Sequence, residues 1–321
     1  MSTVDLFKGK LKAQNKVIWA VGGGKGGTGK TFLSGNLAIS LARYGKKVIL
    51  VDADLGCANL HTCLGIQSTG ATLSDFVKGK VRSIHEVLFE TGIPNLSLIN
   101  GAQDFLEIAN PRYREKMRLI RQIRELEFDY LILDLGAGTS FNILDFFLIS
   151  DVGILALLPE PTSIENVYRF IKSAFYRRFK QIAKSPEIKS VVTRAMDQKN
   201  DLGIRTPFDL IEQVEKIDAS AGKILKEQLY EFKPKVIVNQ VRSNDDITLG
   251  FSMRSSCAKY FGIQVEYVGY IEYDDSVWRA TRLSRPVMLE FPESKSARGV
   301  NRITSNLLKK EQLRFDLLVH G

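Results

Sequence analysis

Short apolar runs alternate along the chain with longer segments of helical periodicity. The apolar runs are Val17–Val21, Lys47–Val51, Leu96–Ile99, Tyr130–Leu133, Val152–Leu158, Lys235–Val241 and Val265–Ile271. Several of them are almost continuous in apolar residues, which is typical of strands that helices cover on both faces. Strands that alternate with helices indicate an α/β fold. We therefore predict a single doubly wound, mostly parallel sheet.

A long polar and charged stretch between Tyr168 and Pro234 interrupts this alternation. Its periodicity predicts helical segments at Asn166–Lys184 and Pro207–Phe232. Because the strand pattern resumes at Lys235, we interpret residues 168–234 as a helical elaboration of the same domain. The predicted organisation is a polar N-terminal tail (1–15), one α/β domain (16–292) that contains the elaboration, and an amphipathic C-terminal tail (293–321).

A glycine-rich loop follows the first predicted strand at once. Its sequence is Gly24-Lys25-Gly26-Gly27-Thr28-Gly29-Lys30-Thr31, which fits the phosphate-binding template G-x-x-x-x-G-K-[ST]. A helix is expected from Thr31 to Tyr44, so backbone N–H groups and a helix N-terminus would both face the phosphates. We predict a nucleotide bound by this loop and Phe32, with Lys30 on the β- and γ-phosphates and Thr31 on Mg²⁺.

Carboxylates end several of the other predicted strands. Asp52 and Asp54 follow the second run, Asp134 ends Tyr130–Leu133, and Glu160 follows the next strand. In an open parallel sheet such strand ends meet at one edge, where ligands bind. Carboxylates are hard ligands that support Mg²⁺, often through water, and one of them can orient or deprotonate an attacking water. A helix cap or a turn is the alternative role for Asp54 and Asp134.

Composition narrows the class of protein only slightly. The chain has 321 residues, 44% of them hydrophobic, and no stretch approaches the about 20 apolar residues that span a bilayer. The polar, basic N-terminus has no signal core, and Cys57, Cys63 and Cys257 form no C-x-x-C pair. We therefore expect a cytoplasmic protein without disulfides or a cysteine-bound cluster. The net charge of +9 suits a nucleotide, a nucleic acid or an anionic lipid surface.

The loop carries a second lysine, Lys25, and in this it resembles the deviant Walker A motif of the MinD/ParA group of P-loop ATPases. Val51–Leu60 resembles the switch I segment of this group, and Asp134–Thr139 resembles its switch II. Pro159–Ser163 resembles the segment after the next strand, and Ile237–Val241 resembles the strand that carries the adenine-reading Asn. The spacing agrees from about Lys16 to Val287. Within this group, the motifs D-A-D-L-G-x-A-N-L and D-x-G-A-G most resemble those of the FlhG-type (YlxH/FleN) proteins. These proteins set the number and site of flagella.

The resemblance implies an ATP-sandwiched homodimer in which Lys25 reaches the partner's nucleotide. It also implies that Asp54 positions the hydrolytic water and that Asp52 and Asp134 support Mg²⁺ through water. Asn239 would hydrogen-bond the adenine, and the Ile271–Val277 loop would close over the base.

Members of this group act as slow switches with ATP, ADP and Mg²⁺ as cofactors. ATP favours the dimer, and a protein partner stimulates hydrolysis. The chain departs from the group in lacking an N-terminal Asp-Gln-Ala motif, in placing Glu272 where MinD has proline, and in its longer helical stretch. The flagellum, a pilus or the division site all remain open as the structure that is positioned.

Two other classes remain as alternatives. A ParA-like partition ATPase would bind DNA nonspecifically, which the positive charge permits. An amidoligase related to cobyrinic acid a,c-diamide synthase would require a glutaminase domain, for which no region has the length. An iron–sulfur carrier would require a C-x-x-C pair near the C-terminus, and the sequence has none.

Two amphipathic segments have two interpretations each. In the C-terminal tail, Val300, Ile303 and Leu307 form a stripe beside Arg302, Lys309 and Lys310. This helix either lies on an anionic membrane surface or packs on the domain. The segment Tyr176–Lys180 either contacts nucleic acid or lipid, or is an ordinary solvated helix face.

Overall fold

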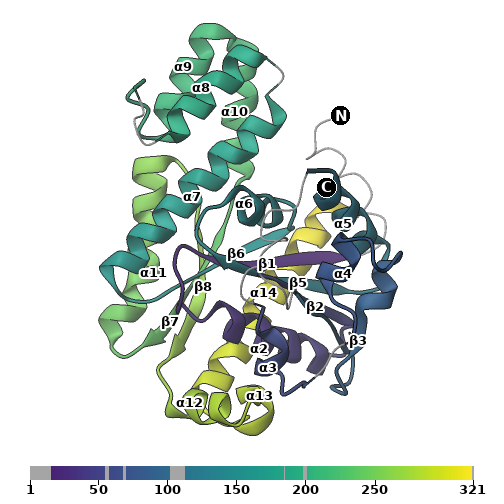
Figure 1. Cartoon of the computed structure of the whole chain (residues 1–321). Coiled ribbons are helices and arrows are strands. Elements are labelled where there is room, and N and C mark those ends of the chain that lie inside the picture. Colours follow the sequence, from purple (N-terminus) through teal and green to yellow (C-terminus); the bar gives the residue numbers. More distant parts are fainter. Residues whose placement is uncertain are drawn as a thin grey trace.

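The computed structural model describes residues 16–54, 58–67, 70–101, 113–183, 185–197 and 201–319. In these residues one eight-stranded sheet has the order β3-β4-β2-β5-β1-β6-β7-β8 (Figure 1). The strands are β1 Val17–Gly23, β2 Val48–Ala53, β3 Leu88–Glu90, β4 Leu96–Ile99, β5 Tyr130–Ala137, β6 Val152–Leu157, β7 Lys235–Val241 and β8 Glu266–Glu272. Each pair of neighbours is parallel except β3 with β4. The predicted fold class is therefore confirmed.

Helices cover both faces of the sheet. One face carries α2 Lys30–Arg43, α3 Leu60–Cys63, α12 Asp275–Arg282, α13 Val287–Glu290 and α14 Lys295–Val319. The other carries α4 Leu73–Val77, α5 Tyr113–Glu125, α6 Phe141–Leu148, α7 Pro161–Ile182 and α11 Asn244–Ser256. Successive residues of β1 alternate between the two apolar layers, with Ile18 in one and Trp19 in the other. Both faces are thus buried, which explains why most strand residues are apolar.

The edge strand β3 was not predicted. It pairs antiparallel with β4, with Leu88 opposite Ile99, after a short 3₁₀ helix at Ile84–Val87. Its residues are only half-buried or exposed. Three residues at a partly solvated edge show too little periodicity to be distinguished from a loop.

The helical elaboration stands beyond the sheet on the C-terminal half of α7 (Figure 1). It consists of α8 Pro186–Met196, α9 Pro207–Ile217 and α10 Ala219–Glu231. The predicted helical segment Pro207–Phe232 is therefore two helices, which meet at Asp218. The Asp218 carboxylate accepts hydrogen bonds from the backbone N–H groups of Ser220 (2.8 Å) and Ala221 (3.2 Å), so it caps α10 where the chain changes direction. Helix α8 was not predicted.

The C-terminal stripe packs on the domain. Val300, Ile303 and Leu307 are fully buried in the layer formed with α2 and β8, so this stripe is not exposed to a membrane. Further along α14, Glu311 accepts hydrogen bonds from Trp19 Nε1 and the Tyr130 hydroxyl, both at 2.8 Å. Side chains from 312 onward, and the N-terminal tail 1–15, lie outside the described residues.

The segment Tyr176–Lys180 is also part of the packing. Tyr176 and Phe179 are buried, while Arg177 pairs with Asp145 and Arg178 with Glu231. Its aromatic residues are therefore core residues of α7 and do not face solvent. Within the described part of the chain, no helix is both long and apolar enough to cross a membrane.

Candidate functional site

The glycine loop between β1 and α2 forms a cradle. Gly27 and Gly29 have φ values of +77° and +87°, in the left-handed region that favours glycine. A Cβ at Gly24 would lie 2.4 Å from the backbone of Asn166, so α7 requires glycine there. A Cβ at Gly26 or Gly27 would meet nothing within 4 Å. The loop thus packs against α7 at one end and leaves open space beside its central glycines.

Two polar groups inside the loop fit an anionic ligand. Lys30 is buried, and burial lowers the pKa of its ammonium, although the charges of Asp134 and Asp54 act in the opposite direction. Thr28 is fully buried, and its Oγ1 has no hydrogen-bond partner. The Lys30 ammonium donates one long hydrogen bond, of 3.4 Å to the Lys25 carbonyl, so both this buried cation and the unpaired Thr28 hydroxyl could accept further partners from a ligand. The phosphates of a nucleotide, at the N-terminus of α2, would satisfy both.

The carboxylates of two neighbouring strands converge beneath this cradle. Asp52 on β2 and Asp134 on β5 are register partners, and both are buried. Asp134 accepts hydrogen bonds from Ser34 Oγ (2.9 Å) and from the Thr31 hydroxyl. Asp52 accepts from the backbone N–H of Leu60 at 3.1 Å. The predicted Mg²⁺ residues Thr31, Asp52 and Asp134 therefore do lie together.

Asp54 lies at the same edge of the sheet, against the second glycine segment. A Cβ at Gly136 would approach the Asp54 Oδ1 to 3.0 Å, so the absence of a side chain at 136 makes room for this carboxylate. The backbone N–H of Asp54 donates to Asp52 Oδ1 at 3.2 Å. The two switch-like segments thus meet at Asp54, where the sequence predicts the water-positioning residue.

The buried carboxylate pair is adapted to a cation. Burial, together with the neighbouring charge of Asp134, raises the pKa of Asp52 to about 8. Burial also raises the pKa of Asp134 to about 6, against the hydrogen bonds from Thr31 and Ser34. Among the described residues no group of three His, Cys, Asp or Glu could hold a metal by itself. Mg²⁺ typically keeps several waters and takes only one or two carboxylates plus phosphate oxygens, so Asp52 and Asp134 would suffice beside a bound nucleotide.

Asp52→Asn is expected to stabilise the nucleotide-free protein at pH 8 but not at pH 4. Unfolded Asp titrates near pH 4, whereas folded Asp52 titrates at about 8. Between these values only the folded state holds the proton, so the free energy of unfolding falls as the pH rises. Removing this ionisation should recover on the order of a few kcal/mol at pH 8. Urea unfolding of both proteins at pH 4 and 8 measures it.

Measuring both proteins at two pH values separates the effect of Asp52 ionisation on stability from the effect of the hydrogen bonds that the substitution changes. Asn retains only one carbonyl oxygen for the N–H groups of Leu60 and Asp54, and this loss is the same at both pH values. An equal difference between wild type and variant at pH 4 and pH 8 would therefore contradict a raised pKa of Asp52.

Lys25 points to the rim of the loop. Its Nζ lies 2.8 Å from Glu160 Oε2 and 3.2 Å from Thr162 Oγ1, at the N-terminus of α7. The Lys25 side chain is 31% exposed. The sequence placed Glu160 at a strand end but did not show that it pairs with Lys25. The sequence feature that could have indicated this contact is a carboxylate directly before a helix, in Pro159-Glu160-Pro161-Thr162.

Asn239 lies beneath the loop. Its Nδ2 donates to the backbone carbonyl of Thr28 at 3.0 Å, and its Oδ1 accepts from the N–H of Gln240 at 3.0 Å. The predicted adenine contact would use the second hydrogen and the second lone pair of the same amide, and it stays a prediction. In the Ile271–Val277 segment expected to cover the base, the ring centroid of Tyr273 lies 3.8 Å from Arg242 Cζ, and Asp274 caps α12. Arg242 itself directly follows β7.

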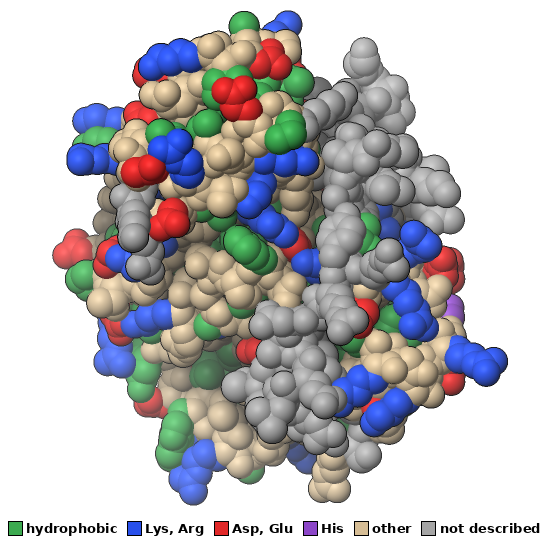
Figure 2. Space-filling model, turned by 45° about the horizontal axis from the view of Figure 1, so that its top comes forward, with side chains coloured by type: hydrophobic (Ala, Val, Ile, Leu, Met, Phe, Trp, Pro, Cys, Tyr) green, Lys and Arg blue, Asp and Glu red, His purple; other side chains and the backbone are tan. Residues whose placement is uncertain are grey.

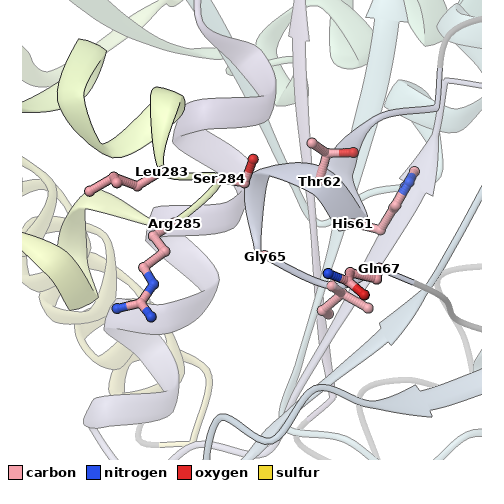
Figure 3. A pocket seen from close by; sticks show the side chains of 8 residues that line it. His61, Thr62, Gly65, Gln67, Leu283, Ser284 and Arg285 are labelled. Carbon is pink, nitrogen blue, oxygen red and sulfur yellow. The ribbon is translucent and has the colours of Figure 1, made fainter.

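A hollow of about 400 Å³ lies outside this site (Figure 3). It is lined by α3, by the turn after it and by the α12–α13 turn, which come together where a Cβ at Gly65 would be 2.7 Å from the Ser284 carbonyl oxygen. Figure 3 shows His61 and Arg285 pointing away from each other, and Arg285 is paired with Glu290 at 3.0 Å. His61 and Arg285 therefore do not converge on a common ligand, and none of the predicted site residues lines the hollow.

Known proteins share both sequence and fold with this chain. It is 27% identical to the antiactivator FleN of Pseudomonas aeruginosa over 283 residues, which cover 87% of this chain and 82% of FleN. It is 33% identical over 168 residues to the flagellum site-determining protein YlxH of Helicobacter pylori, covering 50% of this chain and 54% of YlxH.

Among solved structures, the septum site-determining protein MinD of Pyrococcus horikoshii, complexed with Mg-ADP, superposes with a TM-score of 0.61 at 22% identity. The match covers 91% of this chain and 96% of that one, and it shows the fold. The family model described as the CobQ/CobB/MinD/ParA nucleotide binding domain matches residues 19–287. By this match across most of its length, the chain belongs to the CobQ/CobB/MinD/ParA family of nucleotide-binding proteins.

Proposed function

We propose that this protein is a Mg-ATP-dependent ATPase switch that dimerises on ATP and sets the position or number of a cellular structure. The observation that carries the proposal is the division of labour between two lysines. Lys30 is buried inside the cradle, whereas Lys25 lies on its rim, 2.8 Å from Glu160 and partly exposed. A lysine on the rim is free to exchange an exposed carboxylate for the phosphates of a second copy.

The other site residues take roles that fit their surroundings. Lys30 and the loop from Gly24 to Phe32 hold the phosphates, and Thr31 ligates Mg²⁺, with Asp52 and Asp134 behind it through water. Asp54 positions the attacking water. Lys25 adds positive charge where negative charge develops in the transition state. Electrostatic stabilisation of this kind is usually the largest single contribution to the rate enhancement.

The names of the relatives support a positioning role. YlxH is described as flagellum site-determining, MinD as septum site-determining and FleN as an antiactivator. We extend this role to a flagellum, a pilus or the division site in the cell of origin. The fold offers a surface for a hydrolysis-stimulating partner protein in α8–α10, which stand clear of the sheet (Figure 1). The protein would work in the cytoplasm. Because the Val300–Leu307 stripe is buried, peripheral binding at the inner face of the membrane would require another surface.

Lys25→Ala is expected to remain monomeric with Mg-ATP under conditions in which the wild type becomes a dimer. The variant keeps Lys30 and the cradle, so it should still bind ATP. Gel filtration with light scattering, in ATP and in ADP, measures the mass, and Lys47→Ala on the exposed surface is the matched control. Glu160→Gln removes the partner of Lys25 within the monomer. Because the pair is solvated, this variant should dimerise at modestly lower ATP concentrations. A Lys25→Ala dimer like that of the wild type would refute the sandwich.

The net charge of +9 keeps a ParA-like partition ATPase as the second candidate. Figure 2 shows Lys and Arg interspersed with Asp and Glu over the helical elaboration at the top of that view, where a DNA track would be more uniformly basic. Co-sedimentation with DNA and with anionic vesicles, in ATP and in ADP, separates the two surfaces. DNA binding that falls steeply with salt would favour partition. An amidoligase of the cobyrinic acid a,c-diamide synthase kind is a weaker third candidate.

A further inference from the structure

The geometry points to Asn239 as a positioning residue of the phosphate loop: its side-chain amide holds the Thr28–Gly29 peptide so that the Gly29 N–H faces the phosphates. This assignment rests on the proposed nucleotide binding and adds a residue to it. It also differs from the base-reading role that the sequence implies, because it acts on the triphosphate regardless of the base.

Asn239 is in direct contact with the loop, from a strand 211 positions away in the sequence. Its side chain is 4% exposed, and Nδ2 donates to the Thr28 carbonyl at 3.0 Å. The same nitrogen would lie 2.2 Å from a Cβ at Gly29, so the amide occupies the space beneath that glycine. Gly29 must therefore lack a side chain both for its φ of +87° and for Asn239.

The orientation of the amide is set by its other end. Asn239 Oδ1 accepts the backbone N–H of Gln240 at 3.0 Å, so the nitrogen must face Thr28. Gln240 itself has a φ of +57°, which is uncommon for a residue with a side chain. The end of β7 thus adopts an unfavourable backbone conformation that also locks the Asn239 side chain.

The hydrogen bond to Thr28 fixes the direction of the next N–H group. A trans peptide is planar, with its C=O and N–H pointing in opposite directions, and no described peptide is cis. Holding the Thr28 carbonyl toward β7 therefore turns the Gly29 N–H away from the sheet, into the cradle. The Gly29 carbonyl is held in turn by the N–H of Leu33 at 2.9 Å. Asn239 and α2 together leave the Thr28–Gly29 peptide little freedom to rotate.

Mg-ATP and Mg-tripolyphosphate binding test the assignment, because tripolyphosphate has no base. In Asn239→Ala, the affinity for Mg-tripolyphosphate should fall about tenfold, as expected when a buried carbonyl loses its donor, and the affinity for Mg-ATP should fall by at least this factor. Asn239→Asp keeps the shape and the acceptor for Gln240, but it also adds a negative charge that repels the phosphates of both ligands. Only Asn239→Ala therefore enters this comparison, and Asn239→Asp is kept for the exchange measurement below. Loss of ATP affinity with unchanged tripolyphosphate affinity would overturn the assignment in favour of base reading. Unchanged affinity for both ligands would also overturn it.

Asn36→Ala is the matched control. Asn36 is also 4% exposed, donates to the Phe32 carbonyl at 2.7 Å and accepts from the Met288 N–H at 3.0 Å. It ties α2 to α13 and does not contact the loop glycines. Its removal should lower the unfolding temperature as Asn239→Ala does, with tripolyphosphate affinity unchanged. An equal loss of affinity in both variants would show that general destabilisation is the cause and overturn the assignment.

Hydrogen–deuterium exchange on the nucleotide-free protein gives a second readout, which does not depend on ATP binding. The peptide that contains Gly22–Leu33 should exchange faster in Asn239→Asp than in wild type, with no change in Asn36→Ala. If the wild type binds no nucleotide but this exchange difference appears, the proposed function fails while the contact stands. Unchanged exchange in Asn239→Asp would refute the positioning role directly.

Discussion

Replacing Lys30 with alanine is expected to remove most Mg-ATP binding and to lower ATP hydrolysis by about a hundredfold or more. Lys30 is the buried cation at the N-terminus of α2, and burial already lowers the pKa of its ammonium. Its Nζ donates to the Lys25 carbonyl at 3.4 Å, and the phosphates of a nucleotide would offer it shorter, charge-assisted hydrogen bonds. Isothermal titration with Mg-ATP and release of inorganic phosphate measure the two losses.

The two lysines should separate in this experiment. Lys30→Ala should fail to bind ATP and therefore also fail to dimerise, whereas Lys25→Ala should bind ATP and fail only to dimerise. Unfolding curves of both variants verify that the fold is retained, and the exposed Lys47→Ala again serves as the control. If Lys30→Ala bound ATP as tightly as wild type, the buried ammonium would have another purpose and the cradle would be misassigned.

The strands of the sheet could be predicted from the sequence because burial on both faces requires mostly apolar residues. A strand covered on both faces is apolar at most positions, and seven such runs correspond to seven of the eight strands in the described part of the chain. Strand β3 has neither the length nor the burial to leave such a pattern. The division at Asp218 was missed because α9 and α10 have the same amphipathic character, and one capping carboxylate separates them.

The C-terminal stripe shows a different limit. An apolar stripe on a helix indicates that one face is buried, but it does not indicate whether lipid or protein covers that face. The pattern of Val300, Ile303 and Leu307 therefore fits both alternatives equally. The structure resolves this choice through contacts with β8 and α2, which are distant in the sequence.

The sequence predicted those site residues whose positions follow from the ends of neighbouring strands. Asp52 and Asp134 meet because β2 and β5 are parallel neighbours, which follows from the fold class. The contacts of Lys25 with Glu160 and of Asn239 with Thr28 join residues 135 and 211 positions apart. Such pairings depend on how a loop packs against two other elements, and no local pattern encodes them. The adenine contact and the dimer both remain predictions.

Asp54→Ala is expected to hold the protein as a stable dimer in Mg-ATP while hydrolysis falls by about a hundredfold or more. The change removes the carboxylate at the meeting point of the two switch-like segments. It leaves Lys25, Lys30 and Thr31 in place, so ATP should still bind and bridge two copies. Light scattering after gel filtration should show a dimer that persists for hours in Asp54→Ala, while the wild-type dimer decays as ATP is consumed.

Gly136→Ala provides an independent test of the same geometry. The added Cβ would press on the Asp54 carboxylate, whose Oδ1 lies 3.0 Å from that position, so Asp54 must shift although it is still present. The variant should therefore slow hydrolysis and prolong the dimer, less strongly than Asp54→Ala. If Asp54→Ala stays monomeric in Mg-ATP, the sandwich is wrong. If it dimerises but hydrolyses ATP at the wild-type rate, the water is positioned by a residue other than Asp54.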